Sequence, residues 1–335
     1  MKKYMSSLAL AILALSGAAQ ATENGQLRAL LGAPGFEMAT PQFPGVYGQL
    51  WLQNYRAKQF KGDDGQALKS TASTPLGPLA LRVEGEVEAD VFVARSTWVS
   101  DMRLAEGRVG FSASLPLIRQ RNDIRLSAEL PAGLPASAVR AVQDLLAQQG
   151  AARSGSQSGA GDLDLTGFVD WQQDESRLVL GMSVVAPTGS YEAQRAVNPG
   201  AGKYWTLRPV LLSSAVWENG LELGLRATYS VNSRNTATDV RSGQYLHADY
   251  AAMYRLNDAW RMGLQGYLVE QTTRDQGPGV AAHGNKARIH ALGPMLAYMS
   301  ESGIWSADIK VMNEFSVRNR PEGRTVWLRL NLRLD

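Results

Sequence analysis

Ionisable side chains occupy alternate positions in several otherwise apolar segments of this sequence. In the segment 305–317, Asp308, Lys310 and Glu314 are separated by even numbers of residues, and the odd positions are mostly apolar. Successive side chains of a β-strand point to opposite faces, so the three charges would share one face. Charges of both signs on one face can pair with neighbouring strands, and in a pore they select the solutes that pass.

Histidine is the residue type most suited to acid–base chemistry or metal binding at neutral pH. His247 and Asp249 lie two residues apart on one strand face, where the carboxylate can orient the imidazole. The spacing ties no serine to this pair, His283 lies in a glycine-rich loop, and His290 lies early in a strand. No cluster of His, Asp and Glu has metal-ligand spacing, and the sequence contains no cysteine. We therefore expect no enzyme activity, no cofactor and no metal.

The elements that position these charges have a two-residue hydrophobic period and are longer than the usual globular strand. The segment 221–232 alternates Leu, Leu, Leu, Ala, Tyr and Val with Glu, Gly, Arg, Thr, Ser and Asn. The segments 260–274 and 303–317 exceed the roughly nine to eleven residues that a tilted strand needs to cross a bilayer. A membrane barrel explains this pattern, because one face meets lipid and the other lines a polar lumen. The polar alternation also explains a mean hydropathy of only −0.20.

We therefore predict an all-β fold, a transmembrane antiparallel β-barrel of about 12 strands. The expected strands are 45–59, 83–99, 107–118, 162–172, 177–187, 204–218, 221–234, 244–256, 260–274, 288–299, 304–317 and 324–334. Turn-forming residues make short links at 174–175, 219–220, 257–258 and 300–303, and the intervening connections are longer. The strand parity, projected inward, gives these lumen-lining candidates: Asp162, Asp164, Asp170, Arg226, His247, Asp249, Arg255, Arg261, Asp308, Lys310, Glu314, Arg329 and Arg333.

The first 21 residues have the layout of a secretory signal peptide. Two lysines precede an apolar run at 8–15, and the motif AQA at 19–21 is a small-x-small cleavage site. Cleavage removes two of the three net positive charges, so the mature chain gives no support to a nucleic-acid partner. The expected organisation is a signal peptide at 1–21, a periplasmic or plug-like N-terminal segment at 22–44, and an outer-membrane β-barrel at 45–335.

Tryptophans are grouped beside the short links. Trp171, Trp217, Trp260 and Trp305 each lie within a few residues of one. This placement is typical of the aromatic girdle at a membrane interface. An exported N-terminus places the short links and both chain termini in the periplasm and the long loops outside. The expected location is the bacterial outer membrane, with the signal peptide cleaved.

The connection 131–160 breaks the strand pattern. Val139, Val142, Leu145 and Leu146 fall at helical spacing, and the run 150–161 is rich in Gly, Ser and Ala. We expect one large external loop that carries a short helix and a flexible hinge. A structureless loop of this length in a compact protein is typically functional or disordered.

Short motifs in a fixed order extend along nearly the whole mature chain. They are FPGVY at 43–47, GAGD at 159–162, APTGSY at 186–191, YW at 204–205, TDVRSG at 238–243, QTTRD at 271–275, GPG at 277–279, LGP at 292–294 and NRPEG at 319–323. In this order they resemble the MetA-pathway of phenol degradation family of outer-membrane transporters. The resemblance implies uptake or export of small hydrophobic molecules, such as aromatic compounds or sphingoid bases, and supplies no catalytic residues. The chain departs from common outer-membrane barrels in ending on Leu334-Asp335, where Phe or Trp is usual.

We expect a channel or transporter for small hydrophobic or amphipathic molecules. A narrow lumen with charges of both signs suits neither a wide general pore nor an energised transporter. Candidate solute contacts at the external rim, which an aromatic girdle would also explain, are Tyr191, Tyr204, Trp205 and Trp327. The expected partners are outer-membrane lipid, the hydrophobic solute and the barrel assembly machinery. Two alternatives stay open: a closed barrel that acts as a surface receptor or adhesin through its loops, and an outer-membrane barrel hydrolase.

Overall fold

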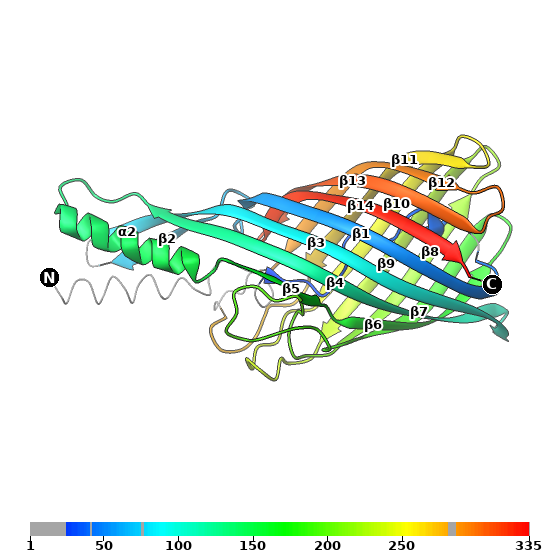
Figure 1. Cartoon of the computed structure of the whole chain (residues 1–335), viewed down its shortest axis with the longest axis horizontal. Helices are drawn as coiled ribbons and strands as arrows, with labels where there is room; N and C mark the ends of the chain where they lie inside the picture. Colours follow the sequence, from blue (N-terminus) through cyan, green and yellow to red (C-terminus); the bar gives the residue numbers. More distant parts are fainter. Residues whose placement is uncertain (1–24, 41, 75–76, 281–285, 335) are drawn as a thin grey trace.

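The computed structural model describes residues 25–40, 42–74, 77–280 and 286–334, and these form a closed antiparallel barrel of 12 strands (Figure 1). The barrel strands are β1 (Gly45–Phe60), β3 (Gly77–Leu104), β4 (Gly107–Ala128), β6 (Leu163–Gln172), β7 (Ser176–Ala186), β8 (Thr206–Val216), β9 (Leu221–Asn232), β10 (Tyr245–Arg255), β11 (Trp260–Gln271), β12 (Arg288–Met299), β13 (Trp305–Arg318) and β14 (Pro321–Arg333). Pairing of β1 with β14 joins the first and last strands and closes the wall. The predicted all-β barrel of about 12 strands is confirmed.

Burial along the strands is reversed relative to a soluble protein. In β9, the Leu225 side chain is 41% exposed on the outer face, whereas Ser230 is 0% exposed on the inner face. Glu222 is buried beside an exposed Leu223 in the same strand. An apolar outer face and a polar inner face are what lipid outside and a polar lumen inside require. The two-residue period of the sequence therefore has the orientation predicted for it.

The barrel has a short-turn end and a long-loop end. The short-turn end holds Gly45, Arg333 and the tight links after β3, β6, β8, β10 and β12. In Figure 1 this end lies at the right, where the C-terminus is marked. Trp260 and Trp305 are exposed at this end, and the ring of Tyr298 lies between them at centroid distances of 5.0 and 5.1 Å. These rings form an outward aromatic band beside the short links.

One segment departs from the predicted alternation. The apolar odd positions of 305–317 were predicted to lie on the outer face, but Val317, the last of them, is buried. In the pairing of β12 with β13, Arg288 faces Arg318 while His290 faces Phe315, so β13 holds an extra residue here. Ser316 has a positive φ of 52°. The prediction for Val317 is wrong because this bulge reverses the strand parity.

An extension projects from the long-loop end, at the left of Figure 1. It consists of residues 77–90 of β3, residues 119–128 of β4, and β2 (Lys69–Thr74), which pairs with β3. The helix α2 (Ala136–Ala151) also belongs to it. Both barrel strands run well beyond the predicted 83–99 and 107–118. Continued pairing of β3 with β4 supports this length outside the closed barrel.

The helix predicted within 131–160 is present as α2. Its Val142 and Leu146 are buried against Leu79 and Leu81 of β3. The expected flexible hinge is wrong, because β5 (Gly155–Ala160) pairs with residues 117–122 of β4. Small residues here allow an extended backbone beside β4. Among the described residues, no helix is both long enough and apolar enough to cross a membrane.

The N-terminal segment, described over 25–40 and 42–44, lies inside the barrel. Leu27 and Leu30 pack against the apolar cluster that contains Trp327. The short helix η3 (Phe36–Met38) buries Phe36 and Met38 against the inner wall formed by β10 and β12. The predicted signal peptide at 1–21 lies outside the described residues.

Candidate functional site

Charged residues of the inner wall hold the N-terminal segment by its backbone. Lys310 Nζ and Arg329 Nη1 donate to the carbonyl oxygen of Ala33 at 3.2 and 2.6 Å. Asp249 Oδ1 accepts from the backbone nitrogen of Gly32 at 2.9 Å. These contacts use side chains of β10, β13 and β14, so three strands fix the middle of the segment.

Arg329 is the centre of a buried ion cluster. It pairs with Asp308 at 2.8 Å and with Glu37 of the N-terminal segment. Removing charges from water is costly unless each one is paired, so removal of one member would leave the others unfavourably buried. Gly35 packs so closely that a β-carbon there would overlap the Arg329 guanidinium. The cluster and this close approach fix the segment against β13 and β14.

A second group of contacts holds the start of the segment near the long-loop end. Arg28 pairs with Asp162 at 3.0 Å, and its guanidinium lies 3.8 Å from the centroid of the Tyr204 ring. Arg208 pairs with Asp164 at 3.1 Å and donates to the backbone oxygen of Arg28. Charge-assisted hydrogen bonds of this kind are the stronger ones in proteins.

The third group lies near the short-turn end. Arg177 pairs with Asp170 at 2.8 Å and donates to the backbone oxygens of Glu37 and Thr40 at 2.9 and 3.1 Å. Gln172 Nε2 donates to the Gln42 oxygen at 3.0 Å. The segment is therefore tied to the wall along its whole described length.

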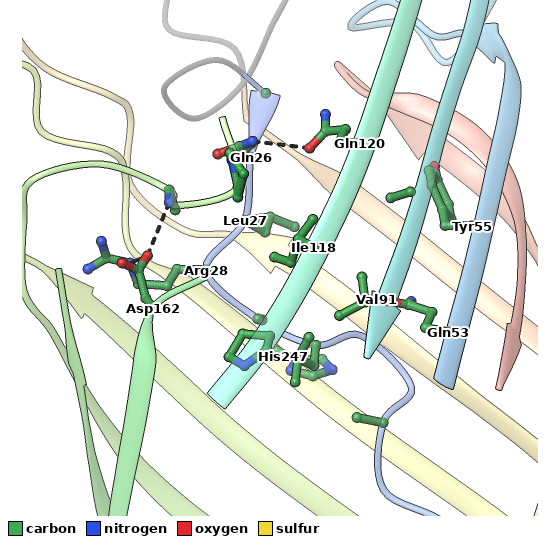
Figure 2. A pocket seen from close by; sticks show the side chains of 18 of the residues that line it. Gln26, Leu27, Arg28, Gln53, Tyr55, Val91, Ile118, Gln120, Asp162 and His247 are labelled. Carbon is green, nitrogen blue, oxygen red and sulfur yellow. Dashed lines mark hydrogen bonds and ion pairs between the residues drawn. The ribbon is translucent and has the colours of Figure 1, made fainter. Parts of the chain in front are cut away.

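A cavity of about 740 Å³ lies between the N-terminal segment and the wall. Its lining begins at Leu81 and Ile124 in the extension and reaches Gln42 and Arg177 near the short-turn end. Figure 2 shows part of it, with Leu27 of the segment beside Ile118 of β4. A volume of 300 to 1,000 Å³ is usual for small-molecule sites. The residues that line the cavity thus extend from the extension to the short-turn end beside the segment.

The polarity of the cavity lining changes along β3 and β4. An apolar strip is formed by Leu81, Val83, Val87, Ala89 and Val91 of β3 with Ile118, Ile124 and Leu126 of β4. Figure 2 shows Val91 and Ile118 in this strip. Gln120 and Asn122 interrupt the strip on β4, and beyond Val91 the lining becomes polar at Arg95 and Ser114. The strip therefore leads from the extension to the charged part of the lumen.

Most of the predicted lumen-lining residues are brought into contact with an oppositely charged or polar partner. The ion pairs are Asp162 with Arg28, Asp164 with Arg208, Asp170 with Arg177, Asp249 with Arg226 and His247, Arg261 with Glu222, and Asp308 with Arg329. Lys310 donates to Gln265, and Glu314 accepts from the hydroxyls of Tyr55 and Tyr267. Arg255 is half-buried and Arg333 is exposed, both at the short-turn end. A role of these residues in solute selection stays a prediction.

Sequence reasoning missed four partners of these residues, namely Arg28, Glu37, Arg177 and Arg208, and a further cation of the cavity lining, Arg95. Arg95 and Arg208 alternate with apolar residues inside predicted strands, so strand parity was the signal that would have found them. Arg28 and Glu37 lie in a segment with no periodicity. Their positions depend on contacts with the folded barrel, which no local pattern encodes.

The four aromatic rim candidates have different environments. Trp205 is 55% exposed, whereas Tyr191 and Tyr204 are buried at the long-loop end. Trp327 is fully buried in the lumen, and its Nε1 donates to the Leu31 oxygen at 3.1 Å. The placement of Trp327 at the rim is wrong, because it shares the inward parity of Arg329. Trp327 instead contacts the N-terminal segment.

The His247–Asp249 pair has a structural contact. His247 Nε2 lies 3.1 Å from Asp249 Oδ1, and both side chains are buried. The same carboxylate pairs with Arg226 at 3.4 Å and accepts from the Gly32 nitrogen. The pair therefore helps to anchor the N-terminal segment. His290 packs its ring 5.8 Å from that of Phe315, and His283 lies outside the described residues.

Comparisons with known proteins agree with the barrel. Among solved structures, the chain is similar to the COG4313 outer membrane channel from Pseudomonas putida F1, with 16% identity, a TM-score of 0.65, and coverage of 89% of this chain and 98% of that one. It is more distantly similar to a TodX mutant monoaromatic hydrocarbon channel, with 12% identity, a TM-score of 0.42, and coverage of 94% and 95%. No curated protein sequence matches the chain.

The first of these likenesses shows the fold of an outer-membrane barrel. A family model described as "Putative MetA-pathway of phenol degradation" matches residues 70–330, which is well over half of the chain. The match includes the extension and all barrel strands except β1 and the end of β14. The chain therefore belongs to the MetA-pathway of phenol degradation family.

Proposed function

We propose that this protein is a passive outer-membrane channel for small hydrophobic or amphipathic molecules. The observation that supports it most strongly is the elongated cavity, which has an apolar strip in the extension and has lining residues near the short-turn end beside the N-terminal segment. An apolar strip followed by a polar interior lets a solute bind and then leave, as conduction requires. The aromatic hydrocarbon named for the TodX structure is one class of solute that this description includes.

The apolar strip provides the capture step. Burial of apolar surface gains roughly 25 cal/mol per Å², so burying about 150 Å² of an aromatic solute gains about 4 kcal/mol. Val83, Val87 and Val91 present such a surface to the cavity. A hydrophilic solute gains nothing from these side chains. The strip therefore favours hydrophobic solutes over sugars or ions.

The N-terminal segment restricts the rest of the lumen. Its contacts with Arg177, Arg208, Lys310 and Arg329 occupy the middle of the barrel. These cations already donate hydrogen bonds to backbone oxygens of the segment. A wide aqueous pore would therefore require the loss of these hydrogen bonds. This arrangement supports a narrow channel, and it is consistent with the segment 22–44 acting as a plug of the barrel domain 45–335.

We further propose that the signal peptide at 1–21 is cleaved and that both termini lie in the periplasm. The outward aromatic band beside the short links supports this orientation, since such bands mark a membrane interface. The long-loop end, including the extension, then faces the outside. Lipid of the outer membrane contacts the apolar outer face, and the barrel assembly machinery inserts the chain.

This orientation predicts at which of two glycines an inserted tag is accessible from outside the cell. Gly279 at the long-loop end and Gly303 at the short-turn end both have a positive φ, and at both a β-carbon would point into open space. We expect an epitope inserted after Gly279 to bind antibody on intact cells. The same epitope after Gly303 should bind only after permeabilisation. The opposite pattern would reverse the assigned orientation.

The channel function predicts slower uptake in cells that lack the gene. Initial uptake of labelled aromatic compounds, alkanes and sphingoid bases would be compared between a deletion strain, its parent and a complemented strain. We expect slower uptake of at least one class, restored on complementation, because the apolar strip provides a capture surface. Unchanged uptake of all three classes would contradict the channel. The alternatives of a surface receptor or a barrel hydrolase would then take its place.

A further inference from the structure

We infer that the cavity prefers amphiphiles with an anionic head group, and that Arg95 binds this group. The inference rests on the proposed function and assigns a substrate class to the same cavity. Arg95 lies on β3 where the apolar strip ends and the polar lumen begins. Its position places a positive charge at the lumen end of the apolar strip, which is the binding surface for an apolar tail.

Arg95 is bound only by neutral groups of the protein. Its guanidinium donates to the hydroxyls of Ser112 at 2.8 Å and Ser114 at 3.2 Å, and more weakly to Thr97 at 3.4 Å. Its carbon lies 5.6 Å from the Trp51 ring centroid. Within the described part of the chain, no carboxylate oxygen lies within 4.0 Å of it. A cation held in a lumen without a directly paired carboxylate is costly, and an anionic ligand would reduce this cost.

The carboxylates that line the cavity are already paired with other arginines. Glu37, Asp162 and Asp164 pair with Arg329, Arg28 and Arg208, respectively. Other cations of the lining also have carboxylate partners: Lys61 with Glu322, Arg177 with Asp170, Arg195 with Glu192, and Arg226 with Asp249. The cavity therefore has no spare carboxylate in its described lining to neutralise Arg95.

Two further arginines of the lining lack an ion pair among the described residues. Arg153 donates to the backbone and side-chain oxygens of Gln149, and Arg320 donates to the Gly25 oxygen. Burial lowers the pKa of Arg153, but a guanidinium stays protonated in proteins. With Arg95, these side chains give the cavity an excess of positive charge. The excess attracts anions and repels cations.

The distance along β3 suits a molecule with a tail and a head. Strand residues rise about 3.3 Å each, so Val87 lies roughly 26 Å and Val91 roughly 13 Å along the strand from Arg95. An alkyl or aryl tail would lie on the apolar strip while its head group reaches the guanidinium. A carboxylate suits this position, because its two oxygens match the paired donors of arginine.

Three ligands of one chain length separate head-group charge from tail binding. Octanoate, octan-1-ol and octylammonium would be titrated calorimetrically into the full chain in lipid nanodiscs at neutral pH. We expect octanoate to bind most tightly and octylammonium most weakly. Tighter binding of octan-1-ol or octylammonium would overturn the anionic preference and leave the hydrophobic channel intact. Absence of binding by all three would contradict the channel and this inference together.

Arg95→Gln tests the residue itself, because glutamine keeps hydrogen-bonding capacity and removes the charge. We expect octanoate affinity to fall about 10- to 100-fold, as for loss of a charge-assisted hydrogen bond, with octan-1-ol affinity unchanged. Arg95→Lys should retain most of the preference for octanoate. Arg103→Gln, at an exposed position of the same strand, is the matched control and should bind as the wild type does. Equal losses for octanoate and octan-1-ol in Arg95→Gln would overturn the role of Arg95.

Discussion

Leu211→Arg is expected to lower the free energy of unfolding in lipid by about 2 to 4 kcal/mol, whereas Leu212→Arg should cost much less. The two leucines are adjacent near the middle of β8. Leu211 is 39% exposed on the outer face, and Leu212 lines the cavity. An arginine at position 211 must enter the bilayer, whereas one at position 212 meets the polar lumen. The pair has the same residue type and membrane depth, so it isolates the face.

The measurement is the free energy of unfolding of each variant in lipid vesicles, obtained from a reversible denaturant titration. A soluble β-sandwich would give the opposite order, because its inward leucine would be in the apolar core. Equal costs, or a larger cost for Leu212→Arg, would mean that the outer face does not contact lipid. Leu212 packs partly against buried apolar residues, so a small loss is expected there as well.

The barrel strands could be predicted from the sequence because their environment is regular. In β9 and β12 each second side chain meets lipid, so hydrophobicity repeats with a period of two. The predicted 288–299 coincides with β12, and several other strands differ from prediction by one to three residues at an end. The bulge at Ser316 was not predictable, since a single extra residue changes parity without changing composition.

The extension was not predicted because its pattern is reversed. In residues 77–90 of β3, the apolar Val83 and Val87 face inward, and Glu84, Glu86 and Glu88 lie on the opposite parity. Hydrophobicity still alternates, but the apolar residues face inward instead of outward where the strand leaves the membrane. A pattern of period two cannot by itself show where that change occurs. The long pairing with β4 is the feature that determines the length of both strands.

The internal position of the N-terminal segment could not be derived from its residues. Gly32 and Gly35 permit a close approach to the wall, yet glycines are also common in exposed loops. What holds the segment is its contact with Lys310, Arg329 and Asp249, which lie more than 200 residues away. These side chains were predicted to pair only with neighbouring strands. Instead, several of them also bind backbone groups of the segment.

Filling the cavity should abolish transport while the barrel remains intact. Ala89 lines the cavity on β3, and Ala94 lies on the exposed outer face of the same strand. Ala89→Trp places a large ring across the apolar strip, whereas Ala94→Trp places the same ring in lipid. The two variants therefore have equal changes in volume and hydrophobicity, and only the first obstructs the cavity.

Influx of labelled toluene into proteoliposomes with an outer leaflet of lipopolysaccharide is the measurement that tests the channel most directly. The wild-type protein and Ala94→Trp should accelerate influx equally over protein-free vesicles. Ala89→Trp should reduce the influx to nearly the protein-free rate, with the barrel shown to be folded by its resistance to unfolding in detergent. Equal influx through Ala89→Trp and Ala94→Trp, or no acceleration by the wild-type protein, would contradict a channel for hydrophobic molecules through this cavity.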